Sequence, residues 1–298
     1  GAVYVFIRSG TNWVQQDKLN ASAIDGLPGD RFGYSVALEG DTLVLGAPGQ
    51  SSQRGAIYVF TRNGVTWAAQ GPKLLANDGA AGDRLGQSIA LSGDTLVAGA
   101  NQAKIGANLN QGAAYVFTRT GTTWAQQTKF TAADGAANDE FGISVAISGD
   151  TAAAGAWRHK VGANDSQGAA YVFSRNGATW TPFPALTAND GGVGDKFGCA
   201  VALGGDTLVV GAYGYLVAQG AAYVFTRAGA WLFQQKLSPS NQSGLKEFGR
   251  AVVISGDTVI VGAPQENITN GAEGAAYVYA APRCPAIYQD VLYAPPNM

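Results

Sequence analysis

The segment Gly-Ala-Ala-Tyr-Val-Phe at residues 112–117 recurs in nearly the same form six times along the chain. The copies begin at residues 1, 55, 112, 168, 220 and 274, with spacings of 52 to 57 residues. A period in this range is typical of a propeller, a solenoid or another repeat array, in which a single unit cannot bury its apolar face alone. The repeat therefore decides the architecture of the chain.

Each period contains four pieces with the composition of β-strands. The first piece follows a Phe-Gly dipeptide, and a Gly-Asp turn such as Ser92–Thr95 leads into the second. The third piece carries the repeated segment, and a tight turn such as Arg62–Gly64 opens the fourth, which contains a tryptophan. Short strands joined by glycine-containing turns predict antiparallel hairpins. The first strands are expected at Ser35–Leu38, Ser88–Leu91, Ser144–Ile147, Ala200–Leu203 and Ala251–Ile254.

Four antiparallel strands per repeat predict an all-β propeller of four-stranded blades, with a β-solenoid as the alternative fold. We expect one propeller domain over residues 1–298, with five near-complete blades and an N-terminal half-blade at Gly1–Leu19. Residues 280–298 form a divergent tail, in which Ile287–Tyr293 is a candidate final strand. Three arrangements remain open: the two ends close the ring unusually, upstream blades are missing, or another chain supplies strands.

The composition agrees with this fold and excludes several classes of protein. Only 13% of the 298 residues are charged and 42 are glycine, against about 25% and 7% in ordinary globular chains. The many aromatic residues argue against disorder, and glycine without a three-residue period argues against collagen. The net charge of −2 and the lack of a basic stripe argue against nucleic-acid binding. Leu208–Phe225 is uncharged but glycine-containing, and the repeat divides it into two strands and a turn, which excludes a membrane span.

The repeat resembles the FG-GAP family, which is found in integrin α-chain propellers and in bacterial surface and secreted proteins. The residues that carry the resemblance are Phe32-Gly33, Phe141-Gly142, Phe197-Gly198 and Phe248-Gly249, with Leu85-Gly86 as a departure, and Gly46-Ala47-Pro48 and Gly262-Ala263-Pro264 downstream. The resemblance covers the chain to about Tyr279 and is closer to the bacterial variety. It implies a propeller, usually seven-bladed in integrins, with an adhesive or recognition role at the cell surface or outside the cell.

The resemblance does not extend to the calcium loops of the integrin-type repeat. Those loops lie between the first and second strands, where this chain has only a short turn with one carboxylate, and calcium needs six to eight oxygen ligands. No cofactor is therefore expected at Asp41, Asp94, Asp150, Asp206 or Asp257. Besides these single aspartates, a pair of aspartates precedes most Phe-Gly dipeptides. The pair either binds a metal ion within its loop or stabilises the turns of that loop through its carboxylates. These pairs are Asp25 and Asp30, Asp78 and Asp83, Asp134 and Asp139, and Asp190 and Asp195.

Aromatic and basic residues also recur once per repeat. The aromatic residues either stack on sugar rings, one site per blade, or fill the contacts between blades, and packing is the favoured interpretation. The repeated arginines are expected to be solvated at tight turns. The residues concerned are Trp13, Trp67, Trp124, Trp180 and Trp231; Tyr4, Tyr58, Tyr115, Tyr171, Tyr223 and Tyr277; and Arg8, Arg62, Arg119, Arg175 and Arg227.

The chain has few residues suited to catalysis. His159 is its only histidine and is expected to be exposed on a loop. Cys199 and Cys284 form either one disulfide or two buried thiols. A hydrolase that uses paired carboxylates in the central funnel is the least favoured alternative function. We therefore predict no catalytic residues.

The loops between second and third strands vary in length and content, which makes their face of the propeller the expected ligand face. Its leading contacts are Trp157, Arg158, His159, Tyr213 and Tyr215. We expect a non-enzymatic extracellular or surface-exposed propeller that binds a protein or glycan partner. The alternatives are a structural subunit joined to its neighbours through the incomplete blade and the tail, and a lectin-like module. The variable loops are Pro48–Arg54, Asn101–Gln111, Trp157–Gln167, Tyr213–Gln219 and Pro264–Glu273.

Overall fold

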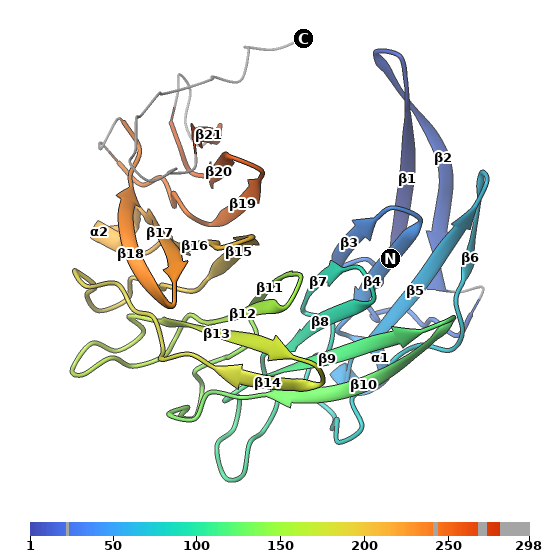
Figure 1. Cartoon of the computed structure of the whole chain (residues 1–298), viewed down its shortest axis with the longest axis horizontal. Coiled ribbons are helices and arrows are strands. Elements are labelled where there is room, and N and C mark those ends of the chain that lie inside the picture. The colour runs from blue at the N-terminus through green and yellow to red at the C-terminus, as the bar shows by residue number, and fades with distance from the viewer. Residues whose placement is uncertain (22–23, 241–243, 268–272, 281–298) are drawn as a thin grey trace.

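The computed structural model describes residues 1–21, 24–240, 244–267 and 273–280 of the chain. Within these ranges the protein is all-β, with an N-terminal two-stranded sheet followed by five antiparallel blades in a propeller arrangement (Figure 1). Blades 1 to 4 have four strands each, and three strands of blade 5 lie in the described residues. The predicted fold class is therefore confirmed.

Each sheet is a meander in which consecutive strands are neighbours. The N-terminal half-blade consists of β1 (Ala2–Ser9) and β2 (Asn12–Asn20), and blade 1 of β3 (Ser35–Glu39), β4 (Thr42–Ala47), β5 (Ala56–Asn63) and β6 (Thr66–Ala69). Blade 2 consists of β7 (Ser88–Ser92), β8 (Thr95–Ala100), β9 (Ala113–Thr120) and β10 (Thr123–Phe130), and blade 3 of β11 (Ser144–Ser148), β12 (Thr151–Ala156), β13 (Ala169–Asn176) and β14 (Thr179–Pro182). Blade 4 consists of β15 (Ala200–Gly204), β16 (Thr207–Ala212), β17 (Ala221–Ala228) and β18 (Ala230–Leu237), and blade 5 of β19 (Ala251–Ser255), β20 (Thr258–Ala263) and β21 (Ala275–Ala280).

The predicted strands agree closely with those observed. The first strand of blade 1 was expected at Ser35–Leu38 and ends one residue later, at Glu39. Leu208–Phe225 divides between β16 and β17, as the repeat predicts. Two single turns, α1 (Gln50–Gln53) and α2 (Tyr215–Ala218), lie in variable loops and were not expected. The candidate strand Ile287–Tyr293 lies outside the described residues.

The inner strands β3, β7, β11, β15 and β19 pack against one another in chain order, along an arc (Figure 1). Each interface between blades is apolar: Val44 and Val59 of blade 1, for example, share a cluster with Leu96 and Tyr115 of blade 2. The repeated tyrosines of blades 1 to 4 and most of their tryptophans are buried in these clusters, which confirms the packing interpretation for these blades. In the half-blade, by contrast, Tyr4 and Trp13 are 50% and 67% exposed.

The glycines of the repeat allow neighbouring blades to approach closely. A Cβ atom added to Gly155 of β12 would lie 1.9 Å from the carbonyl oxygen of Gly198, at the start of blade 4. The same approach joins Gly99 to Gly142, also at 1.9 Å. No other residue fits at these positions, which explains why the Gly-Ala and Phe-Gly dipeptides recur together.

The two ends of the arc expose faces that are covered inside it. Val36 and Leu38 of β3 are 50% and 58% exposed, whereas Ile89 and Leu91, their counterparts in β7, pack against the blade 1 and blade 2 cluster. At the other end, Val253 of β19 is 50% exposed. These apolar faces are blade interfaces that have no neighbouring blade among the described residues.

Candidate functional site

The variable loops and the Asp-Gly loops share one face of the propeller, as predicted. The amide of Gly214, in the variable loop of blade 4, donates to the carbonyl of Asp195, in the preceding Asp-Gly loop, at 3.0 Å. The amide of Arg158 makes the corresponding bond to Asp139 in blade 3, at 3.4 Å. These bonds tie each variable loop to a rigid neighbour.

The opposite face carries arginine clamps rather than the solvated arginines that the sequence suggested. Arg119 Nε donates to Asp94 Oδ1 at 2.7 Å, and its guanidinium lies 5.2 Å from the ring centre of Trp124. Its Nη1 also donates to Thr42 of the preceding blade at 3.0 Å. The expectation of solvation is wrong for these residues because the Gly-Asp turn and the tryptophan lie beside each of them. The same ion pair and ring contact occur at Arg62, Arg175 and Arg227.

The carboxylates of the acidic pairs accept hydrogen bonds within and around the Asp-Gly loops. In blade 2, Asp83 Oδ2 accepts from the Ala80 amide at 2.8 Å, and Asp78 accepts from the Tyr115 hydroxyl at 2.9 Å and from Lys129 Nζ at 2.8 Å. The Lys73 ammonium beside Asp25 likewise holds the pKa of that carboxyl below its usual value. Within the described ranges, no three His, Cys, Asp or Glu side chains converge as metal ligands would. The second aspartates, Asp30, Asp83, Asp139 and Asp195, all accept from a backbone amide three residues earlier.

His159 is buried, at 9% exposure, so the expectation of an exposed loop histidine is wrong. Its Nδ1 lies 2.8 Å from Asp139 Oδ2, and its Nε2 lies 3.6 Å from Asp134 Oδ2. The hydrogen bond with Asp139 raises the pKa of His159, against the effect of burial. In blade 2 the aspartate equivalent to Asp134 is Asp78, which pairs with Lys129. The repeat aligns Lys129 with Ala185, so blade 3 has no lysine at this position, and His159 lies beside Asp134 instead.

Blade 5 inverts the charges of the pair in blade 3. The repeat aligns Lys246 with Asp139 and Glu266 with His159, and the two side chains form an ion pair at 1% and 6% side-chain exposure. The Tyr277 hydroxyl donates to Glu266 Oε2 at 3.1 Å. Blades 3 and 5 therefore bury an acid–base pair of opposite order under the variable loop. Blades 1, 2 and 4 instead have Gln50, Ala103 and Tyr215 at the position of His159.

Aromatic rings and cations gather on the variable-loop face between blades 3, 4 and 5. The ring centres of Trp157 and Tyr213 are 6.0 Å apart. Arg158 and Lys196 each lie 5.3 Å from the Trp157 ring centre, and Arg250 lies 4.5 Å from that of Tyr213. We call these five residues the aromatic–cation cluster.

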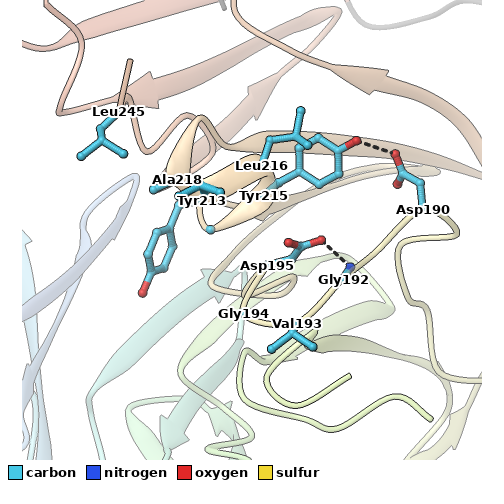
Figure 2. A pocket seen from close by; sticks show the side chains of 12 residues that line it. Asp190, Gly192, Val193, Gly194, Asp195, Tyr213, Tyr215, Leu216, Ala218 and Leu245 are labelled. Atoms are coloured by element: carbon cyan, nitrogen blue, oxygen red, sulfur yellow. Dashed lines mark hydrogen bonds between the residues drawn. The ribbon is translucent and has the colours of Figure 1, made fainter. Parts of the chain in front are cut away.

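A cavity of about 660 Å³ adjoins this cluster and shares Tyr213 with it (Figure 2). Tyr215 lines the cavity, and its hydroxyl donates to Asp190 Oδ2 at 3.0 Å and lies 2.8 Å from Lys236 Nζ. The remaining lining is largely apolar and comes from three loops. Its exposed apolar residues are Val193, Leu216, Val217 and Leu245, at 69%, 55%, 87% and 60% exposure.

The turn α2 presents two of these residues in a left-handed conformation. Leu216 and Val217 have φ values of 46° and 56°, a region that β-branched residues rarely adopt. In blade 1 the loop has the same length and the same turn, and there Ser51 and Ser52 have φ values of 50° and 57°. We call Leu216–Ala218 the apolar turn and residues 51–53 the polar turn.

The structure brings together three of the five predicted ligand-face residues. Trp157, Arg158 and Tyr213 belong to the aromatic–cation cluster, Tyr215 lies in the adjoining cavity, and His159 is buried below the loop. Sequence reasoning missed the cations next to the Phe-Gly dipeptides, Lys196 and Arg250. It also missed the apolar turn, although a loop-by-loop alignment of the repeats would have set residues 216–218 beside residues 51–53.

Cys199 is a free thiol whose Sγ lies 3.4 Å from the carbonyl oxygen of Gly249. In the earlier blades a serine hydroxyl, such as that of Ser144, donates to the corresponding glycine carbonyl of the next blade. Burial raises the pKa of the Cys199 thiol to about 11. The possible disulfide partner, Cys284, lies outside the described residues.

The fold and the repeated contacts define a β-propeller built from one type of blade. The repeats match the FG-GAP repeat family model at residues 13–60, 68–117, 124–173, 180–225 and 231–279, and the chain belongs to this family. A search of curated proteins gives no match. No helix in the described part of the chain is long and apolar enough to cross a membrane.

Proposed function

We propose that the chain is a single-domain, non-enzymatic binding propeller, extracellular or exposed at the cell surface, that recognises a protein partner through its variable-loop face. Membership of the FG-GAP family supports a binding role. The observation that carries the choice of face is the apolar turn, where a leucine and a valine are held in solvent by a strained backbone. Strained, exposed apolar residues cluster at binding sites.

The cost of the apolar turn supports this proposal. A left-handed conformation costs a non-glycine residue about 1–2 kcal/mol, and Val217 gains little packing in return because it is 87% exposed. The same turn is built from Ser51 and Ser52 in blade 1, so the fold does not require apolar residues there. We infer that Leu216 and Val217 are present for an intermolecular contact.

A peptide selection tests the proposal. A phage-displayed random peptide library is selected on the 298-residue chain and, in parallel, on a variant with Leu216→Ser, Val217→Ser and Ala218→Gln, which copies the polar turn. We expect peptide families that are enriched on the wild-type chain and lost on the variant. The proposal fails if no peptide family depends on the apolar turn.

The reciprocal graft provides the matched control. Ser51→Leu, Ser52→Val and Gln53→Ala place an apolar turn on blade 1, away from the cavity lined by Tyr213 and Leu245 and from the aromatic–cation cluster. If binding needs the whole site, this graft will not create a second binding site. If the graft binds the selected peptides with equal affinity, the apolar turn alone causes the binding and the rest of the site is not needed.

The geometry favours a protein over a glycan. A lectin site would need free aromatic faces, whereas cations lie over the rings of Trp157 and Tyr213, and most of the repeated tryptophans are buried between blades. A glycan array is the direct test of the lectin alternative. Binding to any glycan that survives in the polar-turn variant but is lost in Trp157→Ala would favour that alternative.

A second candidate function, assembly through the open ends of the arc, is favoured by the exposed blade face on β3. Val36 and Leu38 present the surface that Ile89 and Leu91 bury inside the arc. Sedimentation of the 298-residue chain over a hundredfold concentration range, beside Val36→Lys with Leu38→Lys, tests this candidate. Association that the double variant removes would support it, and a monomer at all concentrations would exclude it. A deletion of residues 280–298 tests the contribution of the tail, which lies outside the described residues.

A further inference from the structure

Lys196 has an aromatic contact but no carboxylate partner among the described residues. It is half-buried, and its ammonium lies 5.3 Å from the ring centre of Trp157. Burial, together with repulsion from Arg158, lowers its pKa. The equivalent positions in blades 3 and 5, directly before the Phe-Gly dipeptide, are Glu140 and Glu247.

Those two acids are already engaged by other groups. Glu140 Oε2 accepts from Trp157 Nε1 at 3.2 Å and from Asn101 Nδ2 at 2.7 Å, and its Oε1 lies 3.4 Å from Arg158. Glu247 pairs with Arg250 at 3.5 Å. Among the acids that contact the aromatic–cation cluster, Glu140 and Glu247 therefore pair with its two arginines, and Lys196 is the cation without an ion pair in the described residues.

An anion that bound beside Lys196 would lie near three cations, each of which contacts an aromatic ring. Arg158 and Arg250 are exposed and keep donors free for a ligand, since each makes only one ion pair longer than 3.3 Å. A carboxylate that gains charge-assisted hydrogen bonds from such groups binds more strongly than a neutral group would. The local charge balance thus favours a ligand with one negative charge.

The apolar turn lies next to this cation group. Tyr213 belongs to both, because its ring centre lies 4.5 Å from Arg250 and its side chain also lines the cavity (Figure 2). Lys196 directly follows Asp195, which lines the same cavity. Through Tyr213, one extended ligand would therefore contact both the cations and the apolar surface made by Leu216, Val217 and Val193.

We propose that this region binds an extended peptide segment in which a side-chain carboxylate contacts Lys196, Arg158 and Arg250 while a neighbouring aliphatic side chain rests on the apolar turn. The inference deepens the proposed function and rests on it. An acidic polysaccharide would satisfy the cations but would leave Leu216 and Val217 without an apolar partner. An uncharged peptide bound to the same surface would leave Lys196 without an ion pair.

The test uses blocked synthetic peptides, with acetylated N-termini and amidated C-termini, so that side chains carry the only charge. Each has a leucine and a glutamate separated by zero to three glycines, and each is paired with a peptide in which glutamine replaces the glutamate. Binding is followed by NMR through the indole N–H signal of Trp157, assigned with Trp157→Phe. A heparin fragment is titrated as the polysaccharide probe.

We expect at least one spacing to shift the Trp157 signal, with the glutamine peptide binding at least about tenfold more weakly, as the loss of one charge-assisted contact implies. Lys196→Gln and the polar-turn variant should each weaken binding by a similar factor. Lys160→Gln is the matched control, because Lys160 lies in the same variable loop as Trp157 but pairs with Asp165 at 2.8 Å. It should leave the affinity unchanged.

Three results would overturn the inference. They are equal binding of the glutamine peptides, heparin binding that does not depend on the apolar turn, and no shift with any peptide. The peptide selection separates this failure from a failure of the proposed function. If the selected peptides depend on the apolar turn but carry no acidic residue, the proposed function stands and only the carboxylate contact is wrong.

Discussion

At the scale of single residues, different blades use side chains from different positions of the repeat to contact the same aspartate. Blade 2 pairs Asp78 with Lys129 and has Ala103 in the variable loop, whereas blade 3 has Ala185 at the lysine position and His159 in the loop. In blades 1 to 4 one basic side chain thus lies beside the first aspartate of the pair, and in blade 3 it comes from a different part of the repeat.

This exchange predicts a rescue. His159→Ala should lower the free energy of unfolding by about 1–2 kcal/mol, because it removes a hydrogen bond to the buried Asp139. Adding Ala185→Lys should recover part of the loss by recreating the blade 2 arrangement. Urea unfolding of the single and double variants measures both effects. If Ala185→Lys stabilises the wild-type chain equally, the two positions are not coupled.

The same histidine predicts a pH dependence. The pKa of His159 is raised above 6.5 in the folded chain, so its charged form is stabilised by folding. That stabilisation is complete below pH 6.5 and is lost as the pH rises through the folded-state pKa. We therefore expect the difference in unfolding free energy between the wild type and His159→Gln to shrink above pH 6.5. A difference that grows with pH would contradict the raised pKa.

At the scale of the blade, the closest backbone approaches predict where a methyl group is tolerated. Gly155→Ala would place a Cβ 1.9 Å from a carbonyl oxygen of the next blade, and should cost about 2–4 kcal/mol. The control is Gly192→Ala, whose added Cβ would find no atom nearer than 3.9 Å. It should change the stability by less than about 0.5 kcal/mol. Thermal unfolding of both variants measures these changes. An equal loss of stability in the two variants would contradict the argument from close backbone packing.

Blade 5 provides a second prediction at this scale. Lys246→Asp would set two acids together at a buried position and should destabilise the blade by about 3–5 kcal/mol. Combining it with Glu266→His copies the Asp139 and His159 pair of blade 3, and should recover at least half of the loss. Urea unfolding measures this, and a double variant no more stable than Lys246→Asp would show that the pairs are not interchangeable.

The strands were predictable from the sequence because their signals repeat in every period. The first strand of each blade follows a Phe-Gly dipeptide or, in blade 2, Leu85-Gly86. Phe141 of one such dipeptide is fully buried, with its ring centre 5.3 Å from that of Tyr171. The site was less predictable because its members are the residues that differ between repeats. Lys196 stands where blades 3 and 5 have glutamate and blades 1 and 2 have arginine, so its lack of an ion pair is visible only when Trp157 and Arg158 are placed beside it. His159 was placed in solvent because a loop histidine gives no sequence signal of the aspartates that enclose it.

At the scale of the whole molecule, the arc predicts a gradient of stability. In a repeat array each unit is stabilised mainly by its neighbours, and the central strands β8 and β12 are buried along their whole length. By contrast, β20 alternates between exposed and covered residues, and β1 is exposed except at Val3 and Val5, because these strands lack a neighbour on one face in the described chain. The interfaces at the two ends therefore contribute less to the stability of blade 5 and the half-blade.

Hydrogen exchange measured by mass spectrometry tests this gradient. We expect the amides of β8 and β12 to exchange slowest, those of β16 at an intermediate rate, and those of β1 and β20 fastest, since amides open by local unfolding where few apolar contacts hold the strand. Val36→Lys with Leu38→Lys is the control, because it alters the open face without touching an interface between blades. That variant should leave the rates in β12 unchanged. Uniform exchange from β1 to β20 would mean that the blades unfold as one cooperative unit, and would contradict a nearest-neighbour origin of the stability.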